Sequence, residues 1–395
     1  MTVTDHSQAT LESEALEVGS RIQNSRANRF QARGLENHPV PTGREEEWRF
    51  ASLREIAPLF AANEPAFDTE ALTYEVGEVE GLVAGNLGIG EGPRGTALVP
   101  EDRIAAAADE LSANALHLAA PKNTALAEPV RVDIHGERAT TPAYASIVLE
   151  TGESSSATFI LSHTGSALYG QNLELIVGDN SQMTVISIQD WADDAIHVGT
   201  HVASVGRDAT LRHIVVSLGG RAVRINSTTS LVAAGGEVEQ LGLYFADDHQ
   251  HLEHRLFVDH AAPKCTSRVT YKGALQGRGA RSVWVGDVLI RKAAEGTDTY
   301  ELNRNLVLTE GARADSVPNL EIETGDIEGA GHAAATGRFD DEQLFYLRAR
   351  GIPEAEARRL VVRGFFQELI QKIDVPEVRE YLTEQIESEL ARSMS

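Results

Sequence analysis

The sequence predicts a mainly β protein with a parallel β-helix core and helical regions at both ends. From Val130 to about Ile327, short β-branched runs are separated by glycine and aspartate, which is typical of strands and turns. Apolar and polar residues alternate from Val223 to Leu231, as expected for a strand. Turn glycines recur at intervals of 28 to 32 residues, which suits a solenoid coil of three short strands.

The glycine intervals also separate this fold from a β-sandwich, which is the alternative. Glycines 178, 206 and 235 are 28 and 29 residues apart, whereas hairpin-linked strands recur about every 8–12 residues. The spacing therefore favours the β-helix. The other runs that we interpret as strands are Leu173–Val177, Met183–Ile188, Leu211–Leu218, Val238–Phe245, Val283–Ile290 and Leu302–Leu308.

The chain divides into three predicted domains, at residues 1–130, 131–327 and 328–395. Residues 1–130 form a mainly helical domain, which begins with a helix over residues 12–35 that Pro39 and Pro41 terminate. Residues 131–327 form the β-helix core. Residues 328–395 form a second helical domain with broad apolar faces.

The C-terminal domain begins with a strong helix start. Asp340 and Gln343 have the spacing of a capping box, and Gly351 with Pro353 supplies the stop. Just before this helix, residues 329–335 have almost no side chain except His332, and we expect them to form a surface loop.

Composition excludes several classes of function. The chain of 395 residues has 35 Lys and Arg against 59 Asp and Glu, a net charge of −24, which repels nucleic acids and anionic membranes. The N-terminus lacks the pattern of a signal peptide, and no run is long enough to span a membrane. We therefore expect a cytoplasmic protein. Because Cys265 is the one cysteine, this chain alone supplies neither a disulfide nor four thiolates for an iron-sulfur cluster.

Most candidate catalytic motifs have a plain structural interpretation. The chain has no P-loop, and in the segment Gly90–Gly95 a proline and a glutamate oppose phosphate binding, so we interpret it as a turn. Three acidic pairs have the residue types of a glycosidase but are better explained as turns and caps. They are Asp193 and Asp194, Asp247 and Asp248, and Asp340 and Asp341.

Three other sites contain residues that bind metals. His249, His251 and His254 form a cluster that zinc or iron could use, although a polar loop at a strand edge is the favoured interpretation. Cys265 is expected to be a buried structural residue. His332 is the strongest candidate, since an isolated imidazole in a loop of small residues could bind iron or zinc with ligands from a second chain.

Several segments occur together along the chain from about residue 40 to the end. They are Glu45–Phe50, Tyr271–Gly273, Asn303–Leu306, Pro318–Ile322, Gly331-His332, Gly337-Arg338, Asp340–Ile352 and the aliphatic helix Ala357–Phe366. This ordered set resembles the SufB/SufD family of iron-sulfur cluster assembly proteins. The single cysteine makes the chain most similar to the SufD members, because SufB proteins are longer and carry more cysteines.

The resemblance implies a right-handed parallel β-helix that pairs with SufB and binds the SufC ATPase through its C-terminal helical region. It also implies a nascent cluster, or iron, held transiently between SufB and the family histidine that matches His332. Ala330 and Ala334 occupy positions where family members have cysteines, so an imidazole is this chain's expected ligand. The expected SufC contact region contains Asp340, Phe345, Tyr346, Arg348, Arg350, Leu360, Phe365 and Phe366.

The expected function is therefore that of a non-enzymatic scaffold subunit in the SUF complex of SufB, SufC and SufD. One alternative is a homodimer that donates or stores iron. The other is a β-helix enzyme acting on polysaccharides, against which the missing signal peptide and the acids in turns and caps both count.

Overall fold

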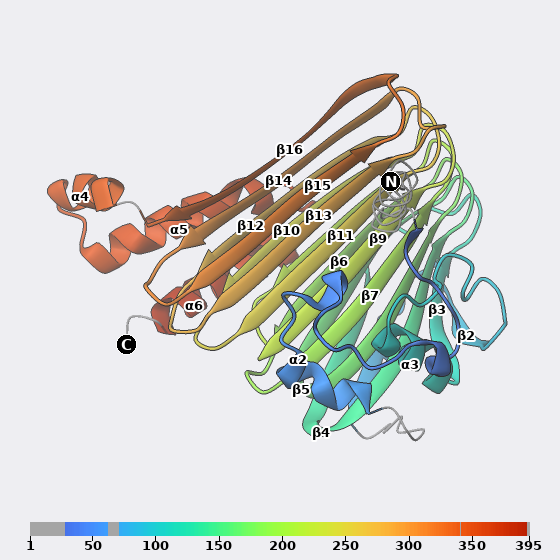
Figure 1. The fold of residues 1–395 in the computed structure, drawn as a ribbon, viewed down its shortest axis with the longest axis horizontal. Coiled ribbons are helices and arrows are strands. Elements are labelled where there is room, and N and C mark those ends of the chain that lie inside the picture. Colours follow the sequence, from blue (N-terminus) through green and yellow to red (C-terminus); the bar gives the residue numbers. More distant parts are fainter. Residues whose placement is uncertain (1–27, 62–70, 340, 393–395) are drawn as a thin grey trace, which may run out of the picture.

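The computed structural model describes residues 28–61, 71–339 and 341–392, and these form a parallel β-solenoid with helices at both ends (Figure 1). Two long strands, β4 (Val130–Thr151) and β5 (Ser156–Val177), each run through both layers of the solenoid. After them, the chain adds one strand to layer 1 and one to layer 2 in alternation. The predicted parallel β-helix with flanking helices is confirmed.

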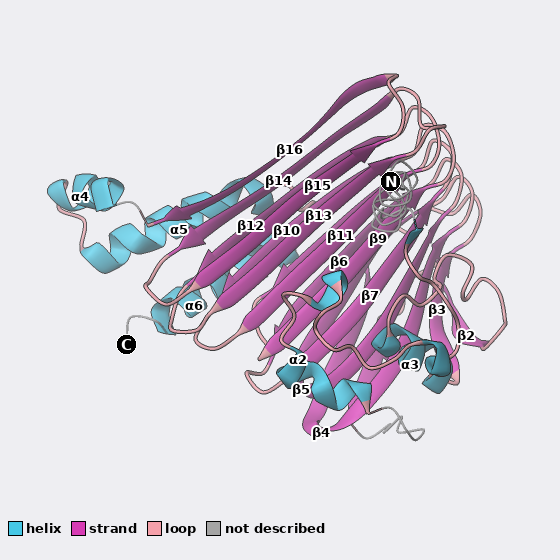
Figure 2. Cartoon of the chain, viewed as in Figure 1, coloured by secondary structure: helices cyan, strands magenta, loops and turns pink. Residues whose placement is uncertain are grey.

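The strands stack in sequence order within each layer (Figure 2). Layer 1 continues from β5 through β6 (Gln182–Trp191), β8 (Thr210–Ser217), β10 (Glu237–Ala246), β12 (Thr266–Leu275), β14 (Thr297–Val307) and β16 (Ile327–Arg338). Layer 2 continues from β5 through β7 (Ile196–Val205), β9 (Ala222–Leu231), β11 (His251–His260), β13 (Arg281–Ile290) and β15 (Arg313–Ile322).

The coil contains two strands, and the expectation of three short strands is wrong. Thr210, Glu237, Thr266 and Asp298 are in register on successive strands of layer 1, at steps of 27, 29 and 32 residues. The interval was therefore predicted correctly. Most strands are ten residues long, so two strands and two turns account for each coil.

The two ends of the solenoid differ. At the first end, β1 (Leu72–Val76) pairs antiparallel with β4, and β2 (Val83–Gly88) pairs antiparallel with β3 (Asn114–Ala120), which lies parallel to β4. At the other end, β15 and β16 are the last strands of their layers, and no described residue forms a strand beyond them.

The N-terminal region packs on the outer face of layer 2. It contains η2 (Leu35–Asn37), η3 (Glu46–Trp48), α2 (Leu53–Ile56), η4 (Ala57–Phe60) and α3 (Arg103–Leu111). Trp48 and Phe60 share a hydrophobic cluster with Ile196 and Val198 of β7. Most of the predicted helix over residues 12–35 lies outside the described residues, and its described part, 28–35, is not α-helical.

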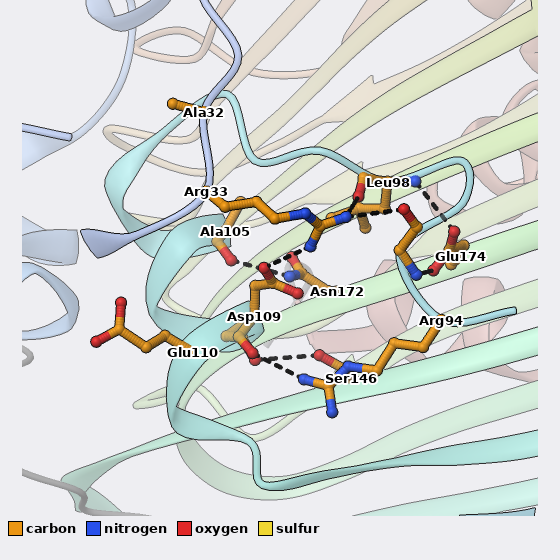
Figure 3. A network of polar contacts seen from close by, with 12 residues as sticks. Ala32, Arg33, Arg94, Leu98, Ala105, Asp109, Glu110, Ser146, Asn172 and Glu174 are labelled. Carbon is orange, nitrogen blue, oxygen red and sulfur yellow. Dashed lines mark hydrogen bonds and ion pairs between the residues drawn. The ribbon is translucent and has the colours of Figure 1, made fainter. Parts of the chain in front are cut away.

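A polar network fixes the segment before α3 to β5 (Figure 3). The Glu174 carboxylate accepts hydrogen bonds from the backbone N–H groups of Gly95 and Ala97, both at 2.6 Å, and of Leu98 at 3.1 Å. The Arg94 guanidinium donates to the Asp109 carbonyl at 2.7 Å. The Gly90–Gly95 segment is thus a structural turn, as predicted.

The C-terminal helices cover the outer face of layer 1. They are α4 (Asp341–Ala349), α5 (Glu354–Ile370) and α6 (Pro376–Arg392). Val362, Phe366 and Leu382 pack against Ile214 and Leu241, whose side chains point outward from layer 1. Burial of this face explains the broad apolar surface of both helices. In Figure 1, α4 lies apart from this packing, beyond the end of β16.

The interior between the layers contains histidines as well as aliphatic residues. His163, His213, His254 and His260 are all buried, and burial lowers their pKa to about 4, 4, 3 and 4, respectively. His213 Nε2 lies 3.0 Å from His201 Nδ1. Each ring is therefore neutral in the folded chain at neutral pH.

These histidines make the fold sensitive to acid. Since the folded pKa is below the unfolded value of 6.5, stability is complete above pH 6.5 and is lost as the pH falls toward 4. At pH 5, each of these histidines costs about 2 kcal/mol of unfolding free energy. Urea unfolding at pH 7 and pH 5 should show that His213→Gln removes about 2 kcal/mol of this loss. His135→Gln, at an exposed histidine, is the control, and an equal effect of both substitutions would contradict the assignment.

Candidate functional site

The open end of the solenoid exposes the inward-facing side of its last two strands. Buried residues dominate the inward positions of β13, but every residue of β15 and β16 is half-buried or exposed. The last strand of a stack has no neighbour on one side, which also leaves backbone donors and acceptors unpaired. This end therefore carries both side chains and backbone groups that a second chain could contact.

His332 lies in β16, and the expectation of a surface loop is wrong. Residues 327–338 pair in parallel with β14, with His332 in register with Glu301. Glycine and alanine have low strand propensity, which is why the segment resembles a loop. The backbone ladder with β14 overrides that propensity. His332 is exposed because no coil follows.

The His332 side chain is on the inward face of layer 1. His213, Gln240, Val269, Glu301 and His332 are in register on successive strands, and the first four are buried between the layers. Residues in register on parallel strands point to the same face, and neighbouring strands lie about 4.8 Å apart. The imidazole is therefore directly beside the Glu301 side chain, one strand further toward the open end.

Glu301 is a site residue that the sequence reasoning missed. It is 1% exposed, and neither carboxylate oxygen has a hydrogen-bond partner among the described residues. A Cβ atom built on Gly286 of β13 would lie 3.0 Å from Oε1 and 2.4 Å from the Trp284 ring, so the carboxylate reaches the opposite layer. Burial, and then the Asp287 charge, raise the pKa of Glu301 to about 8. The signal in the sequence is an acid at an inward position of an alternating strand.

A rigid polar cluster lies beside this pair. Asn303 Nδ2 donates to the Tyr244 hydroxyl at 3.0 Å, and Asn305 Nδ2 donates to Asn303 Oδ1 at 2.8 Å. The Ser316 hydroxyl of β15 donates to Asn303 Oδ1 at 2.6 Å and so links the two layers. These bonds fix the last coils against one another.

Two tyrosines fill the interior by packing on glycines. A Cβ atom on Gly273 would lie 1.8 Å from the Tyr244 ring, and one on Gly242 would lie 2.0 Å from the Tyr271 ring. Any larger residue would displace an aromatic ring. Lys272, between Tyr271 and Gly273, points outward and donates to the Phe365 carbonyl at 3.0 Å and to Glu368 at 2.9 Å.

The chain matches a family model described as SUF system FeS cluster assembly, SufBD core domain, over residues 134–365, which is more than half of its length. The chain belongs to the SufB/SufD family. A Mycobacterium bovis protein named as an iron-sulfur cluster assembly SufBD family protein is 51% identical over 375 residues, covering 93% of this chain and 94% of the relative. A Mycobacterium leprae protein of the same name is 47% identical over 382 residues, covering 95% and 97%.

Mycobacterium bovis has a second, more distant SufBD family protein. It is 26% identical to this chain over 211 residues, which are 53% of this chain and 25% of that relative. An organism with a counterpart of this SufB/SufD chain thus also has another, divergent member.

The family signatures that carried the resemblance lie at structural positions as well as at the open end. Trp48 stacks on Arg224, with 4.3 Å between the guanidinium carbon and the ring centroid, and Arg224 donates to the Glu47 carbonyl at 2.8 Å. Arg224 also forms a buried ion pair with Glu253. This signature therefore fastens the N-terminal region to layer 2.

Two exposed aromatic residues dominate the predicted ATPase contact region. Phe345 and Tyr346 of α4 are 74% and 57% exposed. Arg350 lies over the Tyr346 ring at 4.9 Å, and Arg348 forms an ion pair with Glu354 at 3.3 Å. Asp340 lies outside the described residues, so its capping role is not described.

The three residues predicted on α5 have different surroundings. Leu360 is exposed and Phe365 is half-buried beneath Lys272, so both remain candidates for contact. Phe366 is 0% exposed and packs in the core between α5 and layer 1. The expectation that Phe366 contacts a partner is wrong, because its helical position faces the sheet.

The other candidates have structural roles. His251 and His254 are buried in β11, and His249 lies in the preceding turn, so the expectation of a polar loop holds for His249 alone. Cys265 is buried and its thiol donates to the Ala233 carbonyl at 3.3 Å, while burial raises the pKa of the thiol. Asp193 and Asp247 both lie in turns, as predicted.

Metal binding by this chain alone has limited support in its geometry. No three or more His, Cys, Asp and Glu side chains are grouped to hold a metal ion within the described ranges. His332 and Glu301 are two side chains, so a complete coordination sphere would need further ligands. In the same ranges, no helix is both long and apolar enough to cross a membrane.

Glu301 should make the metal-free protein less stable as the pH rises. Between pH 4.5 and 8 the carboxyl is protonated in the folded chain and ionised in the unfolded chain, so unfolding releases a proton. Glu301→Gln, which stays neutral, should gain about 4 kcal/mol over wild type between pH 4.5 and pH 7.5. Denaturant unfolding in the presence of a chelator measures this difference. Glu328→Gln, at an exposed acid on β16, is the control, and a constant difference across this pH range would contradict the assignment.

Proposed function

We propose that this chain is a non-enzymatic scaffold subunit of the SUF machinery, the SufD-like partner of a SufB-like chain. Its open end pairs with the partner, and His332 contributes an imidazole to iron or a nascent cluster at the interface. The observation that carries the proposal is the position of His332, on the last strand of the open end and on its inward face.

The unpaired edges of β15 and β16 support pairing with another solenoid. Edge strands add strands from a second chain through backbone hydrogen bonds. The first end is already covered by the antiparallel strands β1 and β2, so the open end is the place for a parallel stack to continue.

The presence of two divergent family members in Mycobacterium bovis supports a heterodimer. A second family chain offers a related solenoid with different residues at its open end. This difference lets one chain supply thiolates and the other an imidazole.

Cysteine chemistry supports the SufD-like assignment. Cys265 is buried, and its elevated pKa disfavours the thiolate that binds iron. Ala330 and Ala334 flank His332 on the inward face of β16. The thiolates of a cluster at this site therefore come from the partner chain, and a single imidazole from this side would let the product leave readily.

The exposed aromatic residues of α4 support binding of a SufC-type ATPase. Phe345 and Tyr346 form an apolar pair at the surface, where a partner would bury them. α4 connects β16 to α5, so movement of a bound ATPase would act on the strand that carries His332.

Substitution of His332 tests the site. The chain, its SufB-like partner and the ATPase are co-expressed with wild-type chain or with His332→Ala, and iron and sulfide are measured in the purified complex. We expect the variant complex to assemble and to carry at least tenfold less cluster. An intact complex with full cluster content would remove His332 from the site.

Substitution of Phe345 tests the ATPase contact. Phe345→Asp places a charge where apolar burial is expected, and we expect about tenfold weaker ATPase binding by calorimetry. Ile89→Asp changes an exposed apolar residue in an N-terminal turn and serves as the matched control. Equal affinity of the two variants would argue against α4 as the contact.

A homodimer that donates or stores iron is the alternative that the open end also permits. Native mass measurement of the chain with and without the SufB-like partner distinguishes the two. We expect the partner to convert any homodimer into a heterodimer, and a homodimer that resists exchange would favour the alternative.

A further inference from the structure

Glu301 is a buried acid whose role the fold does not explain. Both of its oxygens lack a hydrogen-bond partner among the described residues, and it is almost completely inaccessible. An unpartnered carboxylate of this kind is costly in a protein interior, where buried acids are normally paired or bound to metals. The fold would be served equally well by an aliphatic residue such as Val269, its neighbour in the same row.

The position of Glu301 gives it one accessible neighbour that binds metals. His332 is in register with it on β16, on the same inward face. The other flank of Glu301 is closed by Val269, and its carboxylate contacts the Gly286 backbone and the region of the Trp284 ring. The carboxylate is thus walled on the solenoid side and can be approached from the open end.

The row beside His332 leaves space for an ion. Ala330 and Ala334 are the inward-facing neighbours of His332 on β16, and neither side chain is larger than a methyl group. Neighbouring strands lie about 4.8 Å apart, a separation at which a carboxylate and an imidazole can bind the same divalent cation.

We propose that Glu301 is a second iron-binding side chain of this chain, which forms with His332 a two-ligand half-site for a divalent first-row cation such as ferrous iron. The inference rests on the proposed function, since it assigns a new residue to the His332 site. One carboxylate oxygen and one imidazole nitrogen suit ferrous iron before sulfide is added. Binding the cation gives the buried carboxylate a partner.

Cobalt(II) alone is the probe, because its visible absorption reports the ligands bound to it. The purified full-length chain, freed of metal with a chelator, is titrated with cobalt(II) under anaerobic conditions. We expect one equivalent to bind to wild type. Glu301→Gln and His332→Ala should each weaken binding at least tenfold, and the double variant should lose little more than either single variant, because both residues bind one ion.

The control is Glu328→Gln, which removes an exposed acid from the strand that carries His332 and should leave binding unchanged. Circular dichroism and thermal unfolding of each variant show that the fold is retained. Wild type that binds no cobalt(II) at millimolar concentration would overturn the proposal. Wild-type affinity in folded Glu301→Gln would also overturn it.

The outcome for Glu301 can be separated from that for the proposed function. If cobalt(II) binding and cluster content in the co-expressed complex fall for His332→Ala but not for Glu301→Gln, the scaffold site stands and Glu301 has no part in it. If cluster content is unaffected by His332→Ala in an intact complex, the proposed function of the site fails, whatever Glu301 does.

Discussion

A stack of parallel strands has two ends, and in this protein one of them is left open. Each strand satisfies its backbone groups only through the strands on either side, so a finite stack must be capped, covered or continued by another chain. Strands β1 and β2 cap the first end in antiparallel pairing. The last strands, β15 and β16, have no such cap among the described residues. The location of the candidate site and the proposed partner both follow from this asymmetry.

The interior of the solenoid is built to hold this open end in a fixed shape. Tyr244 and Tyr271 pack on glycines in neighbouring strands, and Asn303 and Asn305 tie the tyrosines to the last coils. An aromatic ring against a bare backbone leaves little freedom of movement, and a connected hydrogen-bond network rigidifies further. His332 therefore projects from a strand with a rigid base. A scaffold that must present one side chain to a partner benefits from such a base.

The fold was predicted well from the sequence, whereas the site was predicted in part. The repeat of about 30 residues is set by the coil, so it survives in the turn glycines, although the number of strands per coil does not. His332 was found because it is the one large side chain among small ones, but its strand was missed, since pairing with β14 and not propensity creates it. Glu301 carries no local signal, because its burial depends on the opposite layer. Phe366 was misplaced because two adjacent phenylalanines on a helix face different sides.

Hydrogen–deuterium exchange on mixing this chain with its SufB-like partner tests the central claim most directly, since it reports which backbone amides become paired. The account predicts that the amides of β15 and β16 exchange readily in the free chain and are protected in the complex. The amides of β1 and β2 should exchange equally in both. Complex formation without protection of β15 and β16, or with protection confined to the capped end, would contradict the claim that the open end is the assembly surface.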